Sequence, residues 1–158
     1  MTEQDRKFML RAIELSRVKM QEGCGGPFGA VIAVNGQLIA EGWNRVTSTN
    51  DPTAHAEVTA IREACAKLQS FELKDAVIYT SCEPCPMCLS AIYWARIGRI
   101  FYANTRADAA AIEFDDDFLY QEIPKKLEDR KIPTTQICHS DALSVFREWS
   151  AKQDRVKY

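Results

Sequence analysis

The sequence has little that points to export or to a membrane. Its first residues, Met1 to Asp5, lack the basic start and the apolar run of a signal peptide, and nowhere do about eighteen apolar residues follow one another. Lysine and arginine number 20 and aspartate and glutamate 22, a net charge of −2. This balance gives no overall attraction to nucleic-acid phosphates or anionic lipids. We therefore expect a cytoplasmic protein without a membrane partner.

The chain also lacks internal repeats and low-complexity linkers. A hydrophobic fraction of 46% with 27% charged residues is close to the average for globular proteins and excludes collagen, coiled coil and global disorder as descriptions of the whole chain. A length of 158 residues fits one ordinary domain with a sizeable core. We predict a single domain over residues 1–158.

Six cysteines are present without an export signal, which favours metal binding over a disulfide framework. Three of them are grouped as Cys82, Cys85 and Cys88. The other three are scattered singly, as small buried hydrophobic residues often are, and we assign them no role. They are Cys24, Cys65 and Cys138.

The first part of the chain alternates between helical and strand patterns. Thr2 and Asp5 resemble a capping box that opens a helix ending near Gly23, and Asn35-Gly36 joins two antiparallel strands. Asp51-Pro52 predicts the cap and first residue of a second helix, and Pro84 opens a third. The predicted strands cover residues 29–34, 37–43, 76–80 and 99–103.

The pattern weakens beyond residue 105. Short helices are expected over 107–112 and 117–123, a strand over 134–138, and a final helix capped by Asp141. Together, the predicted helices and strands indicate an α/β fold of three layers, α/β/α, with a central mixed five-stranded sheet flanked by helices.

Metal-ligand residue types gather at the starts of two predicted helices. His55 lies in the first turn of the second helix, and Cys85 and Cys88 lie in the first turn of the third, where the helix dipole favours thiolates. Three protein ligands leave a tetrahedral zinc ion one open position, which marks a catalytic site with one ion per chain. If Cys82 were a fourth ligand, the site would be closed and the chain a zinc-stabilised interaction module without catalysis.

Glu57 gives this site a proton carrier. Zinc lowers the pKa of a bound water to about 7, and a neighbouring carboxylate can move the proton, which suits addition of water to an electron-poor carbon. Residues two apart on a helix point to nearly opposite sides. His55 and Glu57 can therefore meet only if His55 projects past the helix end.

These motifs resemble a known superfamily. His55-Ala56-Glu57 followed by Pro84-Cys85-Pro86-Met87-Cys88 is similar to the signature of the zinc-dependent cytidine deaminase-like enzymes. The resemblance implies a helix-covered mixed sheet, His55, Cys85 and Cys88 as zinc ligands, and Glu57 as catalytic proton shuttle. It also implies hydrolysis of an amino group from a base.

Other segments resemble the small bacterial guanine deaminases. These are residues 25–30, residues 114–120, and Lys157-Tyr158. The implied reaction converts guanine, a small-molecule nucleobase, to xanthine and ammonia. The implied substrate contacts are Phe28 on the ring, Asn44 as a hydrogen-bonding group, Ala56, and Asp116 with Tyr158 closing the site.

The resemblance further implies a homodimer in which the C-terminal helix and tail, residues 140–158, can be exchanged between subunits, so that Tyr158 comes from the partner. Cytosine, guanosine and transfer RNA adenosine remain alternative substrates. The net charge and the lack of a basic cluster near the motifs weigh against nucleic acid, although Lys152, Arg155 and Lys157 form a small basic tail.

Overall fold

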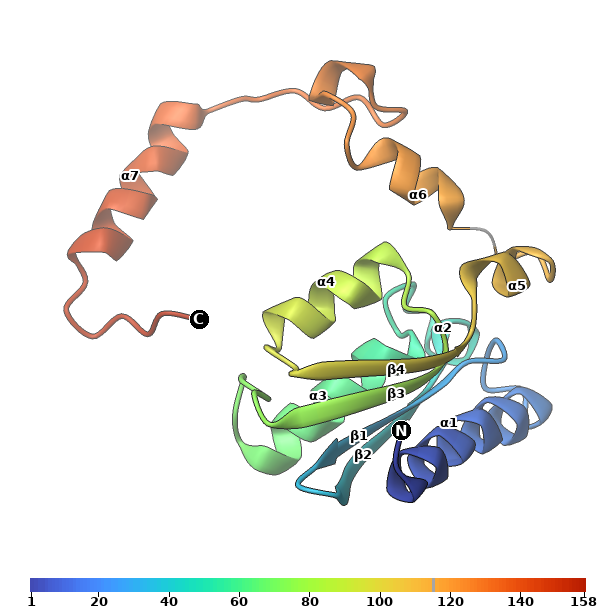
Figure 1. Cartoon of the computed structure of the whole chain (residues 1–158). Helices are drawn as coiled ribbons and strands as arrows, with labels where there is room; N and C mark the ends of the chain where they lie inside the picture. Colours follow the sequence, from blue (N-terminus) through green and yellow to red (C-terminus); the bar gives the residue numbers. More distant parts are fainter. Residues whose placement is uncertain (115) are drawn as a thin grey trace. The chain divides into compact units, whose positions relative to one another are not determined.

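The computed structural model describes residues 1–114 and 116–158, and the chain divides into two compact units, Met1–Asp117 and Phe118–Tyr158. Asp115, within the segment 114–120 named above, lies outside the described residues. The first unit contains the sheet and its covering helices (Figure 1). Among the described residues, no helix has the length and apolar character needed to cross a bilayer.

The sheet has four strands in the order β2-β1-β3-β4. Strands β1 (Gly29–Val34) and β2 (Gln37–Trp43) form the predicted antiparallel hairpin, with positive φ at Asn35 (51°) and Gly36 (74°) in its two-residue turn. Strand β3 (Ala76–Cys82) is antiparallel to β1 and parallel to β4 (Arg99–Asn104). The carboxyl ends of β2, β3 and β4 consequently meet at one edge of the sheet.

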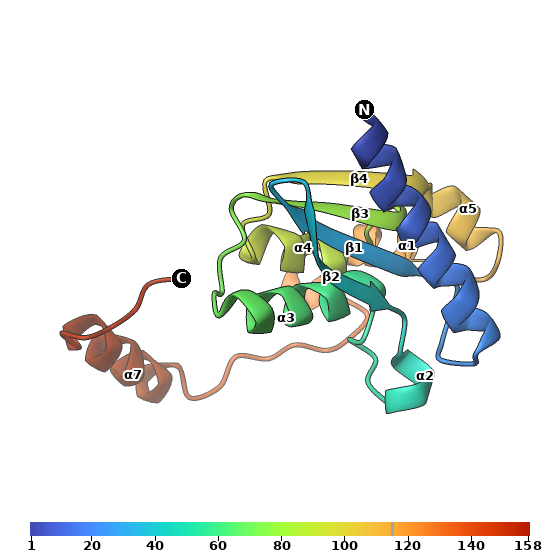
Figure 2. The ribbon, with the colours of Figure 1, turned by 90° about the horizontal axis from the view of Figure 1, so that it is seen from below.

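Helices cover both faces of this sheet (Figure 2). On one face, α1 (Glu3–Gln21) buries Phe8, Ala12 and Leu15 in a cluster with residues of β1 and β3. On the other face, α3 (Ala56–Leu68) and α4 (Pro86–Trp94) pack in a second core cluster. This is the predicted three-layer arrangement.

Close packing fixes the start of α3 against the sheet. A Cβ atom on Gly42 would lie 2.2 Å from the carbonyl oxygen of Ala56 and 2.5 Å from the amide nitrogen of Ala60. Only glycine permits this approach of backbone to backbone. The end of β2 thereby sets the position of the first turn of α3, which carries candidate site residues.

The predicted fifth strand is wrong for the part of the chain that the structure describes. Residues 134–138 form no strand there, and the sheet ends at β4. The segment follows Pro133, which has no amide hydrogen to donate, and its residues are exposed. Strand propensity alone cannot supply the hydrogen-bonding partner that a strand needs.

The second and third predicted helices begin later in the sequence than predicted, at residues 56 and 86 instead of 52 and 84. Helix α3 begins at Ala56, because Asp51 and Pro52 belong to a turn, and α4 begins at Pro86. A short helix, α2 (Val46–Thr49), which the sequence pattern did not predict, precedes that turn. The metal-ligand residues therefore lie at the helix ends.

Beyond β4, the described residues form three α-helices and one short 3₁₀ segment. Helices α5 (Arg106–Ala110) and α6 (Asp117–Glu122) match the predicted short helices, and a 3₁₀ turn covers Leu127–Asp129. Helix α7 spans His139–Ala151 and begins after Cys138, not at Asp141. Asp141 instead lies in the first turn, where its charge complements the helix dipole.

Candidate active site

His55 and Cys85 hold equivalent positions in two helices. Each is the N-cap residue, with φ and ψ of −69° and 160° for His55 and −64° and 167° for Cys85. An N-cap residue has extended backbone, so its side chain projects beyond the helix end. Both side chains are therefore directed to the space beyond the two helix starts.

The three predicted ligands are close together. Nδ1 of His55 lies 3.6 Å from Sγ of Cys85 and 3.5 Å from Sγ of Cys88, and all three candidate ligand atoms lie within 4.8 Å of one another. Zinc bonds of about 2.3 Å to sulfur and about 2.05 Å to nitrogen, set at the tetrahedral angle, place these atoms about 3.6 Å apart. The donor set and its spacing fit a zinc ion.

The electrostatics of the cluster favour a thiolate. The pKa of Cys85 falls to about 4, because it accepts a hydrogen bond from the Cys88 thiol and another from His55. The pKa of Cys88 rises, because Cys88 donates to Cys85 and is buried. The pKa of His55 rises through its contact with Cys85. The lowered pKa of Cys85 favours its thiolate, which is the form that binds a metal cation.

Glu57 is a buried carboxyl beside this cluster. It is the second residue of α3 and only 6% exposed, and its side chain interacts with Cys88 and with its own backbone amide. Burial raises the pKa of Glu57 above its ordinary value. Glu57 lies close enough to His55 to contribute to the raised pKa of His55, and His55 precedes the first helical residue, as this proximity requires.

Cys82 does not join the cluster. Its Sγ lies 3.5 Å from the carbonyl oxygen of Thr105, to which it donates, and burial raises its pKa to about 11. Among the described residues, the group that could hold a metal consists of His55, Cys85 and Cys88. This leaves a tetrahedral ion its open fourth position, as a catalytic site requires.

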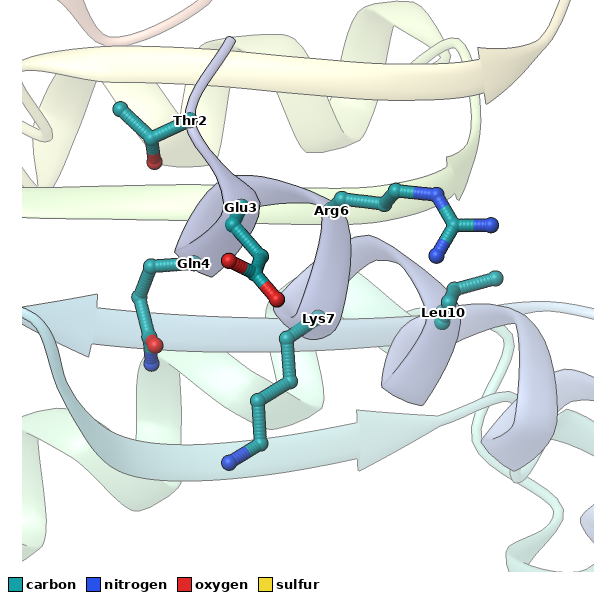
Figure 3. A pocket seen from close by; sticks show the side chains of 6 residues that line it. All are labelled: Thr2, Glu3, Gln4, Arg6, Lys7 and Leu10. Atoms are coloured by element: carbon teal, nitrogen blue, oxygen red, sulfur yellow. The ribbon is translucent and has the colours of Figure 1, made fainter.

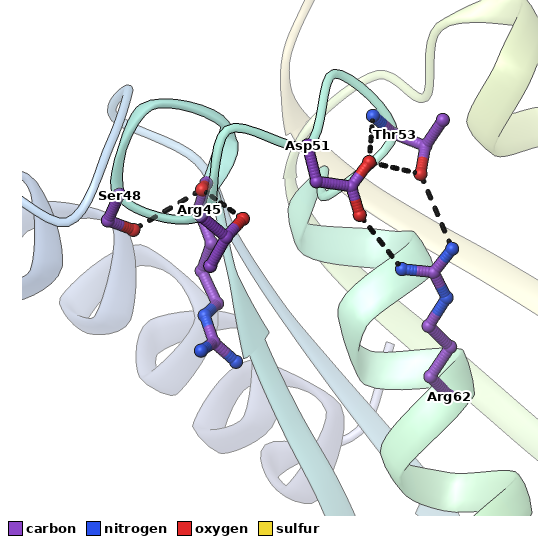
Figure 4. A network of polar contacts seen from close by, with 6 residues as sticks. Arg45, Ser48, Asp51, Thr53 and Arg62 are labelled. Atoms are coloured by element: carbon purple, nitrogen blue, oxygen red, sulfur yellow. Dashed lines mark hydrogen bonds and ion pairs between the residues drawn. The ribbon is translucent and has the colours of Figure 1, made fainter.

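A polar network fixes the loop that leads to His55 (Figure 4). Oδ1 of Asp51 accepts hydrogen bonds from the amide and hydroxyl of Thr53, at 2.8 and 2.7 Å, and Arg62 contacts both residues from α3. The sequence pattern predicts Asp51 as a helix cap and does not predict this role. The Asp-x-Thr spacing, typical of an Asx turn, could have indicated it.

Asn44 connects two segments around the site. Its Oδ1 accepts hydrogen bonds of 3.2 Å from the backbone amides of both Gly26 and Val46, and Asn44 is 6% exposed. Because both backbone amides donate to it, this atom is the oxygen of the side-chain amide. The Nδ2 group is therefore the part of the side chain that can donate a hydrogen bond to another partner. Gly25 lies so close that a Cβ there would be 2.5 Å from Oδ1.

Of the other four predicted substrate contacts, three belong to the first unit and one to the second. The Phe28 ring meets the Phe114 ring edge-on, with centroids 4.9 Å apart. Ala56 is the first residue of α3 and is fully buried. Asp116 lies close enough to contribute to the raised pKa of His55, and Tyr158 belongs to the second unit and is 72% exposed.

A pocket lies along the first turns of α1 (Figure 3). It contains none of the predicted site residues. Its lining residues are Thr2, Glu3, Gln4, Arg6, Lys7 and Leu10.

Comparison with known proteins agrees with this geometry. Residues 2–104 match the family described as the cytidine and deoxycytidylate deaminase zinc-binding region. The chain is 53% identical over 151 residues to guanine deaminase of Bacillus subtilis, covering 96% of this chain and 97% of that protein. A crystal structure of that enzyme superposes with a TM-score of 0.95 and 51% identity, covering 100% of this chain and 99% of the other.

Relatives with lower sequence identity are also deaminases. A structure of guanine deaminase from Nitrosomonas europaea has a TM-score of 0.66 and 33% identity over 92% of this chain and 84% of its own. A tRNA-specific adenosine deaminase of Agrobacterium fabrum is 42% identical over 95 residues, which are 60% of this chain and 62% of that protein. With its zinc ligand geometry and these matches, the chain belongs to the cytidine and deoxycytidylate deaminase zinc-binding family.

Proposed function

We propose that this protein hydrolyses guanine to xanthine and ammonia, with one zinc ion per chain. The observation that carries the proposal is the three-ligand cluster with a buried carboxyl beside it, in a chain that matches a guanine deaminase over almost its full length. Family membership alone supports deamination of several bases. The near-complete match is what favours guanine.

His55, Cys85 and Cys88 would hold the metal, and their N-terminal helix positions set its location. Zinc supplies Lewis-acid activation of water when it is bound, which lowers the pKa of that water to about 7. The carboxyl of Glu57 accepts a proton from the attacking water and delivers it to the leaving amino nitrogen of guanine. Water adds across the C2–N3 double bond, so that C2 gains the oxygen and N3 gains a proton. The bond from C2 to the exocyclic amino nitrogen then breaks as the C2 carbonyl forms, and ammonia leaves.

The contacts with the base follow from donor and acceptor chemistry. Guanine has acceptors at O6 and N7 and donors at its ring N–H and amino groups. The Nδ2 group of Asn44 is a donor whose orientation is fixed by the two bonds to Oδ1. The carboxylate of Asp116 supplies an acceptor, and the ring of Phe28 supplies an apolar surface for the purine.

The exposed face of α7 supports a homodimer with exchanged C-terminal segments. No residue of α7 is buried, and Val145, Phe146 and Trp149 are 59%, 74% and 46% exposed. Apolar surface of this kind favours association. In this proposal, residues 140–158 of each subunit pack on the other, and Tyr158 of the partner subunit would close the site. Light scattering after size exclusion measures the oligomeric state.

The test is an ammonia assay on the zinc-loaded protein with guanine, guanosine, cytosine, adenine and a transfer RNA anticodon stem-loop as separate substrates. We expect ammonia and an equal amount of xanthine from guanine. Ammonia from another substrate with none from guanine would contradict the substrate assignment and leave the deaminase chemistry intact. Absence of ammonia from every substrate would contradict the proposed function.

A further inference from the structure

A buried threonine of the sheet contacts the proposed proton shuttle. Oγ1 of Thr80 lies 3.2 Å from Oε1 of Glu57 and 3.0 Å from the carbonyl oxygen of Cys82. Thr80 is 1% exposed and lies on β3, which has a neighbouring strand on each side. Its hydroxyl therefore has a fixed location relative to the sheet.

Strand periodicity makes this hydroxyl unexpected. Ala76 and Ile78 precede Thr80 on the same face of β3, and both belong to the apolar core beneath α3 and α4. A valine would fill the same volume without a polar group to satisfy, because burying a hydroxyl is unfavourable unless it is hydrogen-bonded. Packing alone does not account for a hydroxyl at this position.

We infer that Thr80 is a positioning residue for the reaction: its hydroxyl holds the Glu57 carboxyl in the orientation needed for proton transfer. Glu57 has two other partners, its own backbone amide and the Cys88 thiol. When Cys88 binds zinc as a thiolate it has no proton to donate, so Thr80 remains as the side-chain partner from the described part of the chain. This inference rests on the proposed function of Glu57.

The hydroxyl suits a carboxyl that gains and loses a proton in each turnover. It can donate its single hydrogen to the Glu57 carboxylate, or donate it to the Cys82 carbonyl and accept a hydrogen from protonated Glu57. A threonine can thus hold Glu57 in the same orientation in both states. An alkyl group could do neither.

A double-mutant cycle tests this role. We expect Thr80→Val to lower kcat on guanine about tenfold with little change in KM, which is the size of effect typical of losing a hydrogen bond to a charged group. Thr80→Ser, which keeps the hydroxyl, should retain nearly wild-type kcat. In a Glu57→Gln background, Thr80→Val should cause no further loss, because the carboxyl that it positions is already gone.

Thr59→Val is the matched control. Thr59 is a buried threonine of α3, 8% exposed, and its hydroxyl makes no side-chain hydrogen bond among the described residues. Its replacement should leave kcat unchanged. Equal losses from Thr80→Val in both backgrounds, or a Thr80→Ser variant as impaired as Thr80→Val, would overturn the inference.

Crystal structures of the zinc-loaded variants give a readout that does not depend on turnover. Glu57 should have a single conformation in the wild type and in Thr80→Ser, and a rotated or divided one in Thr80→Val. If Glu57 keeps its wild-type conformation in Thr80→Val, the inference is wrong. Failure of the wild type to act on guanine would instead contradict the proposed function, and the Glu57 conformations would still decide the role of Thr80.

Discussion

His55 and Cys85 meet because each is the N-cap residue of a different helix: Nδ1 of His55 lies 3.6 Å from Sγ of Cys85. Helices α3 and α4 pack on the same face of the sheet, and both begin at the edge where β2 and β3 end. This edge is where open α/β sheets place their ligands. The fold thereby converts two distant sequence motifs into one metal site.

The ligand assignment predicts zinc content. Purified wild-type protein should contain about one zinc ion per chain, and Cys85→Ser and Cys88→Ser should each lose it, because two remaining ligands bind weakly. Cys82→Ser is the control, since Cys82 donates to Thr105 and lies outside the cluster. Elemental analysis measures each variant. Zinc loss from Cys82→Ser with retention in Cys88→Ser would contradict the assignment.

The shuttle role predicts that Glu57→Gln keeps the fold and the zinc but loses most activity. The amide has nearly the same shape but cannot carry the proton, and positioned proton transfer contributes roughly 10²–10⁴-fold to the rate. Steady-state assays with guanine measure the loss. Glu63→Gln, at an exposed position of the same helix, should behave as wild type. Near-normal turnover of Glu57→Gln would exclude the shuttle.

The proposed closing role of Tyr158 predicts the effect of removing residues 155–158. The shortened protein should fold and bind zinc, because largely exposed residues after the last helix contribute little to the core. Turnover on guanine should fall, because a group that covers the substrate excludes bulk water. Tyr158→Ala should reproduce the loss, whereas Lys157→Ala should not. Full activity of the shortened protein would contradict this role.

The capping box of α1 predicts a pH-dependent contribution to stability. The pKa of Asp5 falls to about 2, because its carboxylate accepts hydrogen bonds from the Thr2 amide and the Tyr79 hydroxyl. A carboxyl whose pKa is lower in the folded than in the unfolded chain stabilises the fold above its unfolded pKa of about 3.9. This stabilisation declines as the pH falls toward 2.

Urea unfolding of the Asp5→Asn variant and of the wild type, at a series of pH values from 7 to 2, measures this contribution to stability. Its midpoint should lie below that of wild type at neutral pH, and the difference should shrink below pH 4. Glu3→Gln is the control, because Glu3 lies in the same helical turn but makes no side-chain hydrogen bond within the described residues. A constant difference between Asp5→Asn and wild type across this range would argue against the linkage.

Local sequence signals determined much of the fold. The Thr2–Asp5 capping box and the Asn35-Gly36 turn form as predicted, because each depends on residues adjacent in the chain. The metal-ligand residue types and their spacing likewise predicted the cluster of His55, Cys85 and Cys88. The exchange of C-terminal segments and the individual substrate contacts stay predictions.

Only the tertiary structure decided how the site is built. Asp51 forms an Asx turn instead of a helix cap, because its carboxylate binds Thr53 through Oδ1 and Arg62 through Oδ2, and His55 is then the N-cap residue. The strand expected at 134–138 is not formed in the described chain, because a strand requires a partner that local propensity cannot supply. The contact of Thr80 with Glu57 joins residues 23 positions apart, a distance that no local pattern can bridge.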